Sequence, residues 1–174
     1  VDAAALRRIG ARQILFGNLT ARETAAVLQT KLKPEGKYYG ATREQVIEQI
    51  VGYTHGPEPK PGVAEVQFAH ATVRTLNRSD LVTPAILEEA VSYGVDRCLQ
   101  RSRRAGTLLG LDAQDVIQFL HQHFLNLAKT LRPTNIAEHC PEWFTDDALQ
   151  VTSIVPVMQR HRRPSIFQRV AATA

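Results

Sequence analysis

The sequence lacks the features that mark several classes of protein. With only 2 cysteines in 174 residues, it is not a disulfide-stapled scaffold. No apolar run reaches the roughly 18 residues that a membrane-spanning helix needs. Glycine-rich phosphate loops, a G-x-S-x-G nucleophile motif and the histidine or cysteine spacings of zinc sites are also missing. We therefore expect a non-catalytic protein with no cofactor, no metal site and no membrane span.

The composition is that of a globular domain with a mild excess of positive charge. Hydrophobic residues make up 44% of the chain and charged residues 22%, close to the averages for folded proteins. The 21 Lys and Arg residues outnumber the 17 Asp and Glu residues, giving a net charge of +4 that permits an anionic partner without requiring one. We expect an intracellular location. Because the chain starts at Val1 rather than at Met, an organelle matrix is one version of that expectation.

Signals for helix ends recur along the chain. Capping residues precede apolar runs of helical period, and glycine or proline follows most of these runs. The strongest N-terminal signals are the capping-box pairs Thr20–Glu23 and Thr42–Gln45, the pair Thr83–Pro84, and Asp112. The predicted helices, with their caps and stops, cover 2–17, 20–34, 42–52, 63–77, 83–106 and 112–133.

The helix predicted over 83–106 has the clearest pattern. Its expected core stripe is Leu87, Val91, Gly94, Val95, Cys98 and Leu99. The segment 63–77 is interpreted as a helix because Val66, Ala69, Val73 and Leu76 also recur at helical spacing.

Strand signals are weak by comparison. The best candidate is VTSIVPV over 151–157, which Pro156 interrupts. The sequence therefore predicts an all-α fold, an irregular bundle of about six antiparallel helices with an extended C-terminal tail. We expect one helical domain over 1–158 and a basic extended tail over 159–174. The proline-rich stretch 54–62 is interpreted as a loop.

Two histidines, His121 and His123, lie inside the helix predicted over 112–133. Residues two apart on a helix point to different faces, whereas a chelating pair on a helix needs a spacing of four. We therefore expect structural or surface roles for both. A composite metal site built from His121, His139 and Cys140 is the alternative, and it requires the chain after Pro133 to fold back on the helix.

Arginines form a stripe on the helix predicted over 83–106. Arg97, Arg101 and Arg104 are spaced by four and three residues, so they share one helix face. Such a stripe suits a partner of opposite charge, including a phosphate backbone. The competing interpretation is a solvated helix terminus that complements the helix dipole.

The tail combines charge with apolar side chains. Arg162 and Arg163 are followed by Ile166 and Phe167. An extended tail with spaced apolar residues is typical of segments that dock on another protein and become ordered there.

These patterns favour a helical interaction module or accessory subunit of a larger protein assembly, with other protein subunits as its partners. The expected partner-binding residues are those of the arginine stripe and of the tail. The alternative function is nucleic-acid binding through the arginine stripe.

Overall fold

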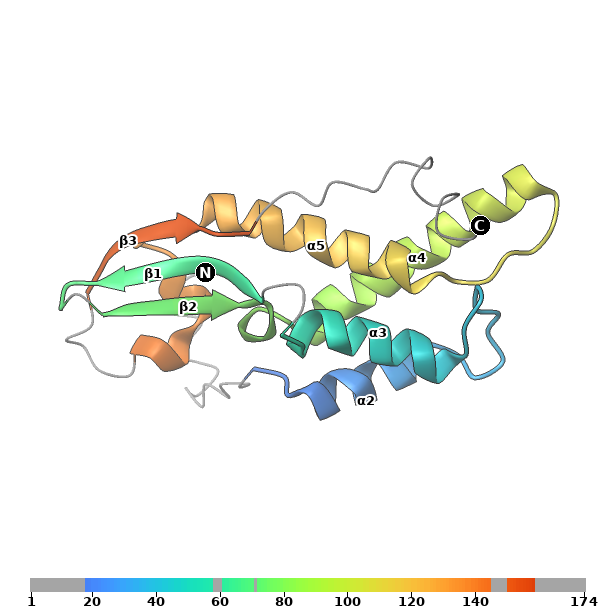
Figure 1. Cartoon of the computed structure of the whole chain (residues 1–174), viewed down its shortest axis with the longest axis horizontal. Coiled ribbons are helices and arrows are strands. Elements are labelled where there is room, and N and C mark those ends of the chain that lie inside the picture. Colours follow the sequence, from blue (N-terminus) through green and yellow to red (C-terminus); the bar gives the residue numbers. More distant parts are fainter. Residues whose placement is uncertain (1–17, 58–60, 71, 145–149, 159–174) are drawn as a thin grey trace, which may run out of the picture.

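A computed structural model of the chain describes residues 18–57, 61–70, 72–144 and 150–158. These ranges contain helices α2 to α6, three β-strands and two short 3₁₀ helices, and the sheet lies at one end of the packed helices (Figure 1). The predicted all-α bundle is therefore wrong, and the fold class is α+β. The helix predicted over 2–17 and the tail predicted over 159–174 lie outside the described residues.

Helices α2 (Ala21–Lys31) and α3 (Arg43–His55) begin at the predicted capping boxes. The Thr20 hydroxyl accepts a hydrogen bond from the backbone N–H of Glu23 at 3.2 Å, and the Glu23 carboxylate accepts one from the Thr20 N–H at 2.8 Å. Helix α3 continues beyond Gly52, the predicted stop. Burial of Tyr53 and Thr54 stabilises this last turn, and it outweighs the cost of about 1 kcal/mol for a glycine inside a helix.

Helices α4 (Pro84–Ala105) and α5 (Ala113–Thr130) pack along each other, as Figure 1 shows. Their predicted caps are confirmed. The Thr83 hydroxyl accepts from the Ile86 N–H at 3.3 Å, and the Asp112 carboxylate accepts from the Gln114 N–H at 2.9 Å. Gly106 ends α4 with a φ of +66°, a left-handed conformation that glycine adopts without a side-chain clash.

The segment predicted as a helix over 63–77 forms a β-hairpin instead. Strand β1 (Gly62–Phe68) pairs with β2 (Val73–Asn77) on one side and with β3 (Val151–Pro156) on the other, and all pairs are antiparallel. Burial alternates along β1: Ala64, Val66 and Phe68 are buried, whereas Glu65 and Gln67 between them are exposed. The apolar residues of this segment fit both a two-residue period and a helical period. The fold follows the two-residue period of a strand.

The weak strand candidate over 151–157 does form a strand, β3, which the all-α prediction had not included. It is an edge strand in the order β2-β1-β3, and Pro156 is its last residue. Proline is tolerated there because an edge strand has a row of N–H groups that need no partner within the sheet.

The inner face of the sheet is covered by aromatic residues that follow the short helix α6 (Ile136–His139). Trp143 and Phe144 belong to the 3₁₀ helix η2 (Pro141–Phe144), and their rings lie 6.4 Å and 6.2 Å from the ring of Phe68. The other 3₁₀ helix, η1 (Arg78–Asp80), connects β2 to the approach to α4. One core then joins the sheet to α2, α3, α4 and α5.

A pair of lysine substitutions tests the corrected fold. The helical interpretation places Val66 and Val73 in the same core stripe, whereas in the hairpin Val66 is 0% exposed and Val73 is 54% exposed. We expect Val66→Lys to destabilise the protein by about 3 kcal/mol or more and Val73→Lys by less than about 0.5 kcal/mol. Urea unfolding followed by circular dichroism measures both. Equal losses of stability would contradict the hairpin.

Candidate functional site

The candidate site is a surface groove. The segments that line it meet at the end of the helices away from the sheet (Figure 1). It has a volume of about 350 Å³ and lies between the C-terminal end of α2, the chain that follows it, α4 and the segment before α5. We call it the lysine-rimmed groove, because the charged residues lining it are Lys31, Lys33 and Lys37.

Three large apolar side chains at this groove are exposed. Val95 is 43% exposed, Leu99 45% and Leu108 59%. Val95 and Leu99 were expected in the core stripe of α4, and that expectation is wrong for these two. The buried stripe is Leu87, Ala90, Val91, Gly94 and Cys98. Scattered exposed apolar residues are ordinary, but a group gathered around a concavity is typical of a binding surface.

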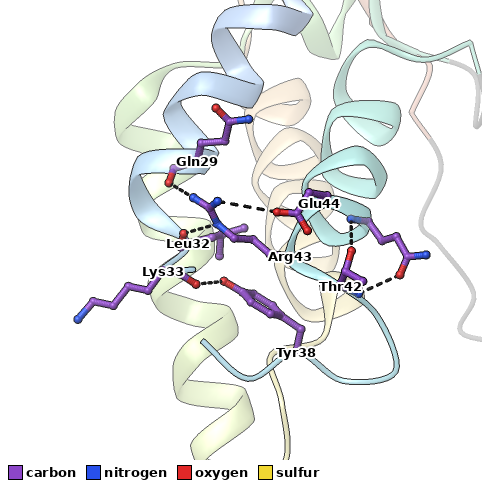
Figure 2. A network of polar contacts seen from close by, with 8 residues as sticks. Gln29, Leu32, Lys33, Tyr38, Thr42, Arg43 and Glu44 are labelled. Carbon is purple, nitrogen blue, oxygen red and sulfur yellow. Dashed lines mark hydrogen bonds and ion pairs between the residues drawn. The ribbon is translucent and has the colours of Figure 1, made fainter. Parts of the chain in front are cut away.

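One wall of the groove is fixed by Arg43, the first residue of α3 (Figure 2). Its guanidinium donates hydrogen bonds to the carbonyl oxygens of Gln29 and, at 2.7 Å, of Leu32. These carbonyls lie at the end of α2, where no further helix residue can satisfy them, and the positive charge complements the helix dipole. The guanidinium also lies 3.9 Å from the carboxylate of Glu44.

Tyr38 holds the chain that follows α2. Its hydroxyl donates to the carbonyl oxygen of Lys33 at 2.6 Å, and burial raises the pKa of Tyr38, so the donor keeps its proton at neutral pH. Tyr38 is partly buried against the core, whereas its neighbour Tyr39 is exposed. Figure 2 shows the Lys33 side chain extending away from this network.

The opposite wall is the segment between α4 and α5. The Tyr39 N–H donates to the carbonyl of Leu111 at 2.9 Å, and the Leu111 N–H donates to the carbonyl of Lys37 at 2.8 Å. The two walls are therefore joined by backbone hydrogen bonds. Gly110 permits this contact, because a Cβ atom there would lie 2.2 Å from the carbonyl carbon of Tyr38.

Side chains of α4 and the α2–α3 connection complete that wall. The Leu109 N–H donates to the Ser102 hydroxyl at 2.9 Å, and the Cys98 thiol donates to the Leu109 carbonyl at 3.0 Å. Lys37 donates from its ammonium group to the carbonyl of Leu108 at 2.8 Å. The backbone that carries Leu108 and Leu109 is thus held in place, and the groove is already formed in the isolated chain.

Of the predicted arginine stripe, the structure uses Arg101 internally. Arg101 forms an ion pair with Asp115 of α5 and donates to the carbonyl of Gly110 at 3.2 Å. Arg97 is half-buried and Arg104 is exposed. Arg162, Arg163, Ile166 and Phe167 lie outside the described residues. The spacing suggests three equivalent arginines on the surface of α4, but in the structure the three side chains have different surroundings.

His121 is half-buried and belongs to a polar cluster with Tyr53 and Arg78, away from the groove. Its Nδ1 lies 3.0 Å from the hydroxyl of Tyr53, whose ring packs under the guanidinium of Arg78 at 4.3 Å. Burial raises the pKa of Tyr53, opposed by its hydrogen bond with Arg78. Arg78 is 1% exposed, so this cluster joins α3, η1 and α5 around a buried guanidinium.

His123 lies in different surroundings, stacked on Phe119 with ring centroids 6.3 Å apart. The two histidines thus contact different parts of the fold. Among the described residues, no group of three or more His, Cys, Asp or Glu side chains could hold a metal ion, so His121, His139 and Cys140 do not form such a site. Each described helix is too short or too polar to cross a membrane.

No protein-family model matches this sequence, and a search of curated proteins finds no significant match. The candidate site therefore rests on geometry and chemistry. Sequence reasoning missed the groove, because its lysines and its exposed apolar residues come from separate segments that only the fold brings together.

The ion pair between Arg101 and Asp115 gives a stability prediction. Asp115→Asn leaves a half-buried guanidinium without its counter-charge, and we expect a loss of about 2 kcal/mol in the free energy of unfolding. The double variant Arg101→Met/Asp115→Leu removes both charges and should recover most of that loss. Arg104→Met, at an exposed position of the same helix, is the control, with an expected change within about 0.5 kcal/mol. A double variant as unstable as Asp115→Asn would contradict this account.

Two histidines make stability depend on pH. Burial lowers the pKa values of His55 and His123 below the ordinary 6.5, with Asp80 and Glu89 respectively opposing the shift. Below about pH 6.5 these two histidines bind protons more readily in the unfolded chain than in the folded one. Protonation therefore favours unfolding, and the free energy of unfolding falls as pH falls. Urea unfolding at about pH 5.0 and about pH 7.5 measures this difference. The variant His55→Gln/His123→Gln should show a smaller difference, and an unchanged difference would assign it to other groups.

Proposed function

We propose that this protein is a non-catalytic interaction module, an accessory subunit that binds another protein through the lysine-rimmed groove. The observation that carries the proposal is the exposure of Val95, Leu99 and Leu108 around a hollow whose walls are already held by hydrogen bonds. A partner gains binding energy from burying these side chains without first ordering the surface that carries them.

The tail expected over 159–174 is the second element of this proposal. Its apolar residues Ile166 and Phe167 follow a basic stretch, a combination that suits docking on the same partner or on a neighbouring subunit. An intracellular location, with an organelle matrix as one version of it, belongs to the same proposal.

Nucleic-acid binding through Arg97, Arg101 and Arg104 receives less support. A phosphate that bound Arg101 would compete with the carboxylate of Asp115 and with the carbonyl of Gly110. That competition would weaken the ion pair that joins α4 to α5.

The test is affinity purification of the full chain from its native source, with half of each sample treated with nuclease. We expect stoichiometric protein partners that survive nuclease, that are lost with Leu108→Asp, and that are weakened by deletion of 159–174. A charged side chain at Leu108 cannot be buried against an apolar partner without a large desolvation cost.

The matched control is Val155→Asp, which places the same charge at an exposed apolar position on the sheet, where Val155 is 54% exposed. It should retain the partners. Partners that are lost with nuclease would favour nucleic-acid binding. Partners that bind the Leu108→Asp variant as well as the unaltered chain would overturn the role of the groove.

A further inference from the structure

We infer that the occupant of the lysine-rimmed groove is an amphipathic helix of a partner protein, with a row of large apolar side chains and carboxylates at one end. This inference rests on the proposed function and adds the chemistry of the partner. It follows from the shape of α4 at the groove, from the charges on the rim and from the charge of the chain's own tail.

The apolar surface of α4 has the geometry of a helix-packing ridge. Val91, Val95 and Leu99 all line the groove and are spaced four residues apart. Val91 is nearly buried at its floor, whereas Val95 and Leu99 are exposed. Residues at this spacing form the row that inserts into the groove of a second helix in the commonest mode of helix packing. The two exposed members lie about 6 Å apart along the helix axis, roughly one turn, so a short partner helix covers them.

The segment before α5 provides the second side of a helix-binding channel. Leu108, the most exposed of these residues at 59%, and Leu109 both line the groove across from that ridge. Hydrogen bonds to Ser102, Cys98 and Lys37 hold the backbone of this segment in place beside the groove. A preformed channel with apolar walls is the surface that helix-in-groove recognition uses.

The rim charges select the partner's polar residues. The charged residues lining the groove are Lys31, Lys33 and Lys37, with no carboxylate among them. Lys37 is hydrogen-bonded to the carbonyl of Leu108, and Lys31 forms an ion pair with Glu88 at 2.7 Å. Of the three lysines, Lys33 therefore has the ammonium group with the fewest contacts inside the protein. A carboxylate of a partner protein would complement this charge.

An adjoining hollow of about 400 Å³ sets the direction of the charge preference. It shares Lys31, Val91 and Val95 with the groove, but its other polar residues include Glu88 and Asp96. Carboxylates are thus favoured at the Lys33 end and disfavoured at the Asp96 end. A helix with its acidic residues gathered at one end fits both hollows.

The chain's own tail has the wrong charge for this site. Its basic residues are Arg160, Arg162, Arg163 and Arg169, and it contains no acidic residue from 159 to 174. Placing that stretch beside the rim lysines would bring like charges together, which costs binding energy. A partner segment that carries carboxylates is the better complement.

Fluorescence anisotropy with two labelled peptides tests the inference on the full chain. Both peptides have about four helical turns and one row of leucines. One carries glutamates at one end, and the other carries lysines at the same positions. We expect the glutamate peptide to bind at least about tenfold more tightly, a difference that shrinks as sodium chloride is added.

Charge reversal on the rim supplies the decisive comparison. Lys33→Glu should weaken the glutamate peptide about tenfold and strengthen the lysine peptide. Lys129→Glu makes the same change at an exposed position of α5 outside the groove, and should alter neither affinity. Equal binding of the two peptides, or binding of neither, would overturn the inference.

Two further arms distinguish other occupants. Deletion of 159–174 should leave the glutamate peptide's affinity unchanged within about twofold, and a tenfold rise would identify the tail as the occupant. Vesicles of phosphatidylserine and phosphatidylcholine should not co-sediment with the chain; co-sedimentation that Lys33→Glu abolishes would assign the groove to a membrane surface. If native partners depend on Leu108 while the peptides show no charge preference, the proposed function stands and this inference alone fails.

Discussion

The ion pair between Arg101 of α4 and Asp115 of α5 determines how one end of the molecule is built. The same guanidinium donates to the carbonyl of Gly110, so one side chain links the packing of two helices to the position of the segment between them. A partly buried ion pair adds little net stability, because desolvation offsets the attraction. Its effect is instead geometric, since few positions of the 106–112 segment satisfy both contacts. That segment then forms a wall of the lysine-rimmed groove.

The helix ends could be predicted from the sequence because their causes are local. A Thr20 or Thr42 hydroxyl needs only a backbone N–H three residues away, and the sequence displays both partners. Gly106 and Pro84 act through their own backbone preferences. Such signals do not depend on the rest of the chain, and the structure confirms these four, although α3 continues past the predicted stop at Gly52.

The sheet could not be predicted in the same way because its partners are distant in sequence. The Thr152 hydroxyl donates to the carbonyl of Gln67, a separation of 85 residues. The stretch around Val66 fits a period of two as well as one of 3.6, and short apolar runs do not resolve that ambiguity. The pairing of β1 between two antiparallel strands decides in favour of the strand, because it satisfies the backbone of β1 on both sides.

The candidate site shows the same division between local and distant causes. The spacing of Arg97, Arg101 and Arg104 is visible in the sequence, but the carboxylate that pairs with Arg101 comes from the next helix. The stripe expected for α4 did contain a usable signal. Its members from Leu87 to Leu99 form a wide apolar stripe, and α5 and α2 together bury only part of it. The excess, Val95 and Leu99, is the part that the groove exposes.

Folding and binding use different side chains at this end of the molecule. The walls of the groove are held by backbone and polar contacts such as those of Arg43 and Tyr38, while Val95, Leu99 and Leu108 remain exposed. These three side chains contribute little burial to the folded monomer, so the core does not account for their apolar character. Exposed apolar side chains on a well-ordered surface promote aggregation unless a partner covers them. That balance is the physical argument for treating the groove as an interface.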